Sequence, residues 1–125
     1  MNENELSKVI IGACIEVHKE LGPGLLESVY EHCLSYELLQ QGFKISRQVP
    51  VPVIYKGEIL ELGYRLDIWV NDLVIVEVKS VDNLHDIHLA QMLTYLRLTK
   101  CKLGLLVNFN QLRVIDGIKR VVNRL

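Results

Sequence analysis

The sequence predicts a single α/β domain with a small mixed sheet flanked by helices. Three observations support this fold class: apolar residues recur at helical spacing over residues 6–41, the spacing then changes to about two, and a continuous apolar run at 103–108 follows a further helical segment. A chain of 125 residues suffices for one hydrophobic core and not for two. We therefore expect one domain over 1–125.

Two helices are expected before residue 42. Apolar residues recur every three or four positions over residues 6–21, and the Gly22-Pro23-Gly24 cluster then stops the pattern. A second apolar stripe runs over about residues 25–41, and Gly42 follows it as a C-terminal stop.

The strands come next. Valines alternate with polar residues and prolines over 48–53, before a Lys56-Gly57 turn, and the two prolines place this strand at an edge or a bulge. Residues 59–70 and 73–79 are then expected to pair as a hairpin around Asn71-Asp72.

The last third of the chain predicts a helix and a buried strand. The helix covers about residues 82–99, and LGLLVN at 103–108 is typical of a strand buried on both faces. Residues 112–124 fit either a short strand or a frayed end. The expected order is therefore helix, helix, three strands, helix, strand.

Composition excludes several classes of protein. No apolar run approaches the roughly 20 residues that a membrane span needs, so we expect no membrane partner and a cytoplasmic location. The three cysteines lack the spacing of a disulfide framework or a zinc ribbon. The net charge is −1, yet residues 97–125 hold one acid and seven basic residues, which are Arg97, Lys100, Lys102, Arg113, Lys119, Arg120 and Arg124. This basic segment suits either phosphate contacts or a solvated face without a partner.

The register of the hairpin places two carboxylates opposite each other. A three-residue loop gives one wholly aliphatic face, made of Leu66, Ile68, Val70, Val74, Val76 and Val78. The other face pairs Asp67 with Glu77 and Arg65 with Lys79. Opposed like charges cost up to about 1 kcal/mol unless a cation lies between them, and carboxylates suit Mg²⁺ or Mn²⁺. The alternative is that Lys79 and Arg65 neutralise the acids on a solvated face.

The segment LDIWVNDLVIVEVK resembles the core motif of the PD-(D/E)XK nuclease superfamily, whose restriction-endonuclease-like αβββαβ core matches the expected element order. The resemblance implies that Asp67 and Glu77 are metal ligands and that Lys79 is the catalytic lysine. QMLTY, with Gln91 and Tyr95, resembles the QxxxY motif of the RecB-like branch. It implies that both side chains face the site and orient Lys79 or a phosphate oxygen.

A further stretch, GLLESVY at 24–30, fits the pattern that names the GxxExxY protein family. Helical spacing points Glu27 over the sheet, and the resemblance implies a third acid that binds metal or orients water. The alternative is an ordinary first-turn glutamate favoured by the helix dipole. His18 lies where some RecB-like enzymes have a metal-binding histidine, and His88 could also approach the site. Either histidine could instead be structural.

The resemblance implies a metal-dependent nuclease that acts on DNA, with RNA as the second choice. On this hypothesis Glu27 and Gln91 approach one pocket from two helices. A non-catalytic binding or assembly module with the same fold is the alternative. A mean hydropathy of +0.21 leaves apolar surface for a partner or for a homodimer.

Overall fold

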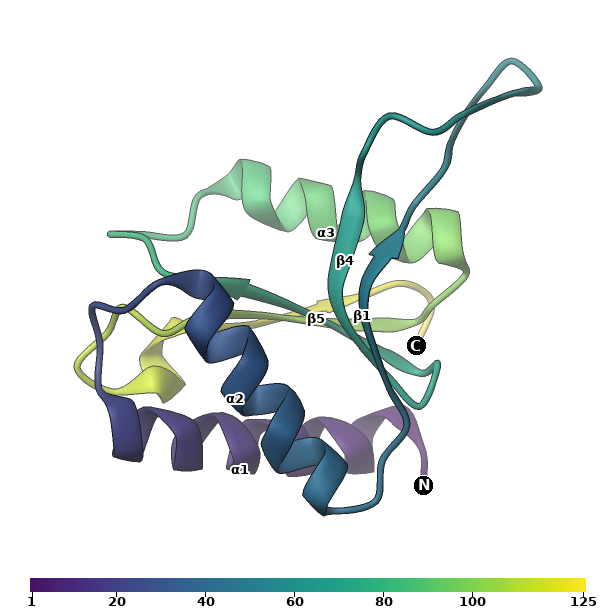
Figure 1. Ribbon diagram of the computed structural model, residues 1–125. Coiled ribbons are helices and arrows are strands. Elements are labelled where there is room, and N and C mark those ends of the chain that lie inside the picture. Colours follow the sequence, from purple (N-terminus) through teal and green to yellow (C-terminus); the bar gives the residue numbers. More distant parts are fainter.

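A computed structural model describes all 125 residues and shows a five-stranded mixed sheet between two layers of helices (Figure 1). Helices α1 (Glu3–Leu21) and α2 (Glu27–Gln40) cover one face, and α3 (Asp86–Thr99) covers the other. The strand order is β1-β4-β5-β6-β7, in which only β5 and β6 are parallel neighbours. The strands of this sheet are β1 (Ile45–Pro50), β4 (Arg65–Val70), β5 (Val74–Lys79), β6 (Leu103–Asn108) and β7 (Ile118–Val122). The predicted fold class is confirmed.

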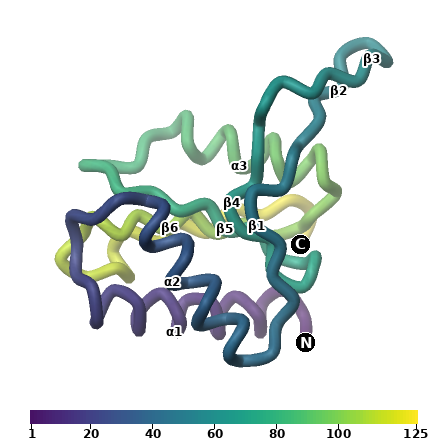
Figure 2. Tube along the Cα trace, in the orientation of Figure 1, coloured from purple at the N-terminus to yellow at the C-terminus, as the bar shows by residue number.

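A separate hairpin extends from this body. Strands β2 (Val53–Tyr55) and β3 (Glu58–Leu60) pair only with each other around the predicted Lys56-Gly57 turn, and Figure 2 shows them projecting beyond the sheet. The predicted strands over 48–53 and 59–70 are therefore each interrupted, which corrects the expectation of continuous strands. Prolines at 50 and 52 cannot donate to a ladder, and Gly63 adopts a left-handed φ of 86°. The β2–β3 unit, here called the arm, is thereby set apart.

Two hydrophobic clusters lie on the two faces of the sheet. The cluster under α1 and α2 contains the predicted aliphatic face of the hairpin except Leu66, and in it the Tyr30 ring stacks on Phe109 at 4.4 Å. Leu66 packs instead with Ile75 and the buried side of α3. The placement of Leu66 on the first face was wrong, because the alternation of β4 against β5 ends before this residue.

The C-terminal segments complete the sheet. All six residues of β6 are buried, as predicted from the apolar run. Residues 112–124 contain a short 3₁₀ helix, Val114–Gly117, and then β7, which pairs antiparallel with β6.

Helix α3 begins at Asp86 rather than at 82, because buried Asn108 binds the backbone N–H and carbonyl of Val81 and holds that segment outside the helix. None of the three helices has the length and hydropathy that crossing a lipid bilayer requires.

Candidate active site

Strands β4 and β5 separate at the point where the predicted acids lie. The three pairs nearest the turn match the predicted register, and the ladder stops after Ile68 and Val76. Beyond it, Oδ2 of Asp67 accepts a hydrogen bond from the Val78 N–H at 2.8 Å. A side-chain carboxylate therefore replaces a strand carbonyl and holds the two strands apart. We call this opening the fork.

Glu77 lies inside the fork with little exposure to water. Glu77 is 5% exposed, and its Oε1 atom has no hydrogen-bond partner. Burial raises the pKa of Glu77 to about 9, and a hydrogen bond shared with the Asp67 carboxyl and the charge of Asp67 add to the rise. The charge of Lys79 acts in the opposite direction. The charges of Asp67 and Lys79 therefore both act on the Glu77 carboxyl, in opposite directions.

The acid pair fits a divalent cation chemically. An orphaned buried carboxyl oxygen next to a second carboxyl is unfavourable unless a proton or a cation compensates it. No group of three or more His, Cys, Asp or Glu side chains forms a ligand cluster, so the fork offers a partial set of ligands. Mg²⁺ is commonly held in this way, by one or two carboxylates together with water and phosphate oxygens.

Glu27 is tied to the end of β5. Its Oε2 accepts a hydrogen bond from the Ser80 N–H at 3.0 Å, and the Ser80 hydroxyl donates to the Leu25 carbonyl at 2.7 Å. These bonds attach the N-terminus of α2 to Ser80, the residue that follows Lys79 at the end of β5. Glu27 and Asp67 consequently line the same open pocket, whose volume is about 710 Å³.

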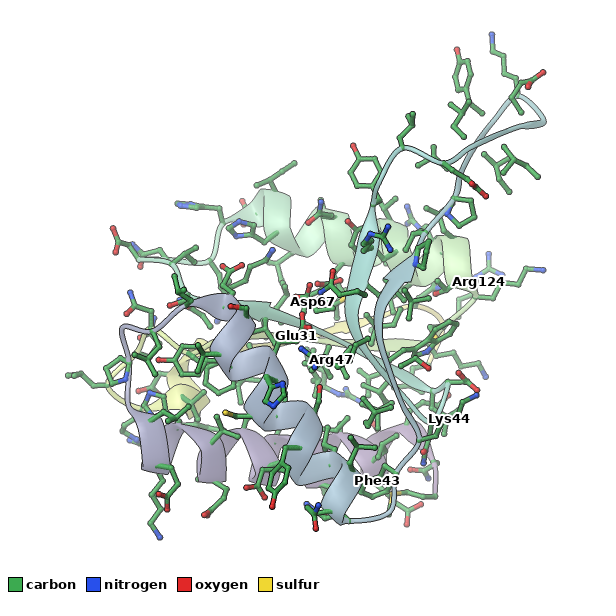
Figure 3. The ribbon with its side chains drawn as sticks, in the orientation of Figure 1. Glu31, Phe43, Lys44, Arg47, Asp67 and Arg124 are labelled. Carbon is green, nitrogen blue, oxygen red and sulfur yellow. The ribbon has the colours of Figure 1, made fainter.

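Sequence reasoning missed a polar network in this pocket. Glu31 is 7% exposed, and its carboxylate accepts from Arg47 at 2.9 and 3.1 Å and from Nε2 of Gln48 at 2.7 Å. Gln48 has a left-handed φ of 51° and lies in β1 opposite Asp67, between two regular pairs. Figure 3 shows Glu31, Arg47 and Asp67 beside one another between α2 and β4. The four-residue spacing from Glu27 to Glu31, which places both on one helix face, is the signal that could have found it.

Tyr95 and Gln91 line one groove on α3, and neither shares the pocket of Glu27. Tyr95 is 7% exposed, and burial raises its pKa, followed by the nearby charges of Glu77, Tyr64 and Asp67. Gln91 is exposed and lines an apolar groove of about 450 Å³ between α3 and the arm. The prediction that Gln91 and Glu27 approach one pocket was wrong, because this side of α3 faces the arm.

Comparison with known proteins agrees with this geometry. A family model described as the PD-(D/E)XK nuclease superfamily matches residues 4–121. The chain belongs to the PD-(D/E)XK nuclease superfamily. Searches of the curated proteins and of the solved structures each gave no significant match. Asp67, Glu77 and Lys79 all lie within the matched residues.

Within this superfamily member, the other motif residues have structural contacts. The Tyr30 hydroxyl donates to the Gly22 carbonyl at 2.5 Å and accepts from the Leu25 N–H at 3.1 Å, which holds the loop before α2. Nε2 of buried His18 is bonded to the Gln111 carbonyl at 2.8 Å. Nδ1 of His88 accepts from the His85 N–H at the start of α3. Neither histidine lines the pocket of Glu27 and Asp67.

Proposed function

We propose that this chain is a metal-dependent nuclease that hydrolyses phosphodiester bonds of DNA, with RNA as the second choice, and that it is a GxxExxY-type member of its superfamily. The observation that carries the proposal is the orphaned Oε1 atom of buried Glu77 in the fork, where the Asp67 carboxylate binds the adjacent Val78 N–H. The GLLESVY segment supports the GxxExxY assignment, since its Glu27 reaches the same pocket.

Asp67 and Glu77 would hold Mg²⁺ or Mn²⁺, and Glu27, which lines the same pocket as Asp67 without forming a three-acid cluster, would orient a water. When bound, such an ion polarises a phosphate and lowers the pKa of a coordinated water. His18 is left out of this ligand set, because its Nε2 already bonds a backbone carbonyl.

The remaining roles belong to the chain's own polar groups. Lys79 follows Glu77 on the same face of β5, so its ammonium group would stabilise negative charge that develops on the phosphate. The hydroxyl of Tyr95, beside the acids, would donate a hydrogen bond to a phosphate oxygen. Gln91, one turn earlier on α3 and exposed, would contact the substrate strand rather than Lys79.

A second candidate function is supported by a different region. The arm and the adjoining end of α3 expose a set of large apolar side chains, which comprises Ile54, Tyr55, Ile59, Leu62, Tyr64 and Ile87. Such a surface favours a non-catalytic binding or assembly module, including a homodimer through the arm. In that case the protein would keep the superfamily's fold and the acids of the fork but would not cleave nucleic acid.

Two substitutions separate the candidates. Asp67→Asn removes a charged ligand and keeps its shape, so Mn²⁺ affinity and cleavage should both fall. Lys79→Ala leaves the carboxylates in place, so Mn²⁺ binding should survive while the cleavage rate falls by about 10²-fold or more. Asp116→Asn and Lys8→Ala, at exposed positions away from the fork, are the matched controls.

The measurements are titration calorimetry with Mn²⁺ and cleavage of labelled single- and double-stranded DNA and RNA. If the parent binds Mn²⁺ and cuts none of these substrates, the binding or assembly module is the correct reading. If the parent binds no Mn²⁺ at all, a proton rather than a cation compensates the buried acid, and the nuclease proposal is wrong.

A further inference from the structure

Four cations line a second pocket, between the C-terminal end of α3 and the end of β7. Its volume is about 730 Å³, and its basic residues are Arg97, Lys100, Lys102 and Arg124. The other lining residues are apolar or neutral, and none is an acid. The two salt bridges of the protein, Lys44–Asp72 and Arg47–Glu31, involve none of these four side chains. We call this site the basic pocket.

The helix dipole explains only part of this cluster. Arg97 and Lys100 lie at the C-terminus of α3, where cations are favourable. Lys102 and Arg124 come from other segments. The two segments are tied together, because the Asn123 N–H donates to the Lys102 carbonyl at 2.8 Å and its side chain donates to the Cys101 carbonyl. The backbone thus holds four like charges close together without an internal counter-ion, and this arrangement favours an external anion.

The position of the basic pocket relative to the fork can be taken from the sheet. Lys102 immediately precedes Leu103, which pairs with Val74 at the start of β5, whereas Lys79 ends that strand. Five residue steps along β5 span about 16 Å. Because phosphates on one strand of duplex DNA advance about 3.4 Å per nucleotide along the helix axis, a duplex that runs along β5 would place several nucleotides between the two sites.

We propose that the basic pocket binds a phosphate of the substrate's nucleic-acid backbone, several nucleotides from the phosphate held at the fork. This inference rests on the proposed function, because it names how the same substrate is held at a distance from the acids. A phosphate group fits the chemistry of the pocket, since two guanidinium groups offer paired donors and two ammonium groups add charge. The contact carries affinity without sequence preference.

The test compares two double variants that lose the same net charge. Arg97→Gln with Lys102→Gln removes two cations of the pocket at positions without left-handed backbone. Lys8→Gln with Lys19→Gln removes two exposed cations of α1, on the other face of the sheet, as the control. Binding of a fluorescent DNA duplex is measured by anisotropy in a chelator, over a series of salt concentrations, so that no cleavage occurs.

The pocket variant should bind the duplex about 10-fold or more weakly at low salt, and the slope of log affinity against log salt should decrease by about two. The control should keep the parent's slope. Equal losses in both variants would overturn the proposal, since they would reflect overall charge alone. Circular dichroism should give both variants the unfolding temperature of the parent, which shows that binding is compared between folded proteins.

Two further measurements distinguish failure of the basic-pocket proposal from failure of the nuclease proposal. Inorganic phosphate that raises the unfolding temperature of the parent, together with unchanged duplex binding by the pocket variant, would identify a small-anion site and overturn the strand contact. Cleavage by the parent with identical duplex binding in both double variants refutes the basic pocket and leaves the nuclease. Absence of cleavage with the expected loss of slope refutes the nuclease and leaves the phosphate contact.

Discussion

The two ends of the β4–β5 hairpin are built from the same kinds of residue and differ in how they are closed. At the turn end, Val70 pairs with Val74, and the turn carries the Lys44–Asp72 salt bridge, whose side chains are 65% and 53% exposed. At the other end the ladder stops, Asp67 binds the Val78 N–H, and Glu77 is left with an orphaned oxygen. Charged groups face water at one end and are enclosed at the other.

This difference shows which end of the hairpin has charged groups that lower the stability of the fold. A carboxylate in water at a turn costs little, whereas a buried pair of acids destabilises the fold unless a proton or a cation compensates it. The enclosed end therefore offers a site for a cation, and the apolar face of the same hairpin stabilises it. Four substitutions sharpen this comparison.

Removing the last closed pair should have the largest effect on stability. Ile68 is fully buried and is the β4 residue of the last pair before the fork. We expect Ile68→Ala to lower the free energy of unfolding by about 2–5 kcal/mol, because it leaves a cavity under α1 and α2. Urea denaturation followed by circular dichroism measures this loss. A loss below about 1 kcal/mol would mean that the fork is not supported by the core beneath it.

Glu77→Gln should alter stability in the opposite direction. The folded-state pKa of about 9 lies above the ordinary value of 4.5, so the folded protein keeps a proton that the unfolded chain releases as the pH rises. The stability contribution of this carboxyl is complete below about pH 4.5 and is lost as the pH rises through about 9. In a chelator, the variant should therefore gain on the parent between these values. Parallel unfolding curves from pH 5 to pH 9 would contradict the buried acid pair.

The sequence predicted the parts of this fold that depend on local periodicity. The helical stripes, the apolar run of β6 and the hairpin register around Asn71-Asp72 each follow from side-chain alternation and turn chemistry, and the structure has them. The same alternation predicted that Asp67 and Glu77 face each other. It did not predict that Asp67 would take the place of a backbone carbonyl, because a pairing rule assumes that the ladder continues.

The missed features depend on contacts between distant segments. Glu31 meets Arg47 and Gln48 because α2 crosses β1, and the four-residue spacing from Glu27 marks the helix face but not the strand that it meets. Gln91 faces the arm because the strands around 51–64 leave the sheet. The basic C-terminal segment was visible as a count of charges. Its concentration in one pocket depends on β7 ending beside the C-terminus of α3.

Breaking the polar network at the enclosed end should have an intermediate effect. Glu31→Gln removes the charge that holds Arg47, whose side chain is 37% exposed and therefore partly screened. We expect a loss of about 1–2 kcal/mol in unfolding free energy, below the value for a fully buried pair. The cleavage rate should also fall, because the single amide oxygen of the variant cannot replace both carboxylate oxygens that accept from Arg47 and from Gln48, which lies opposite Asp67. Unchanged cleavage with reduced stability would restrict this network to a structural role.

The exposed salt bridge at the turn end should have the smallest effect. Asp72→Asn removes the partner of Lys44 at 2.7 Å, but both side chains are more than half exposed, so solvent and salt screen their attraction. Asparagine also tolerates the left-handed φ of 53° at this position, which keeps the turn intact. We expect a change below about 0.5 kcal/mol in unfolding free energy and no change in Mn²⁺ affinity. A loss as large as that of Glu31→Gln would show that the turn end is as tightly enclosed as the fork, and the contrast between the two ends would fail.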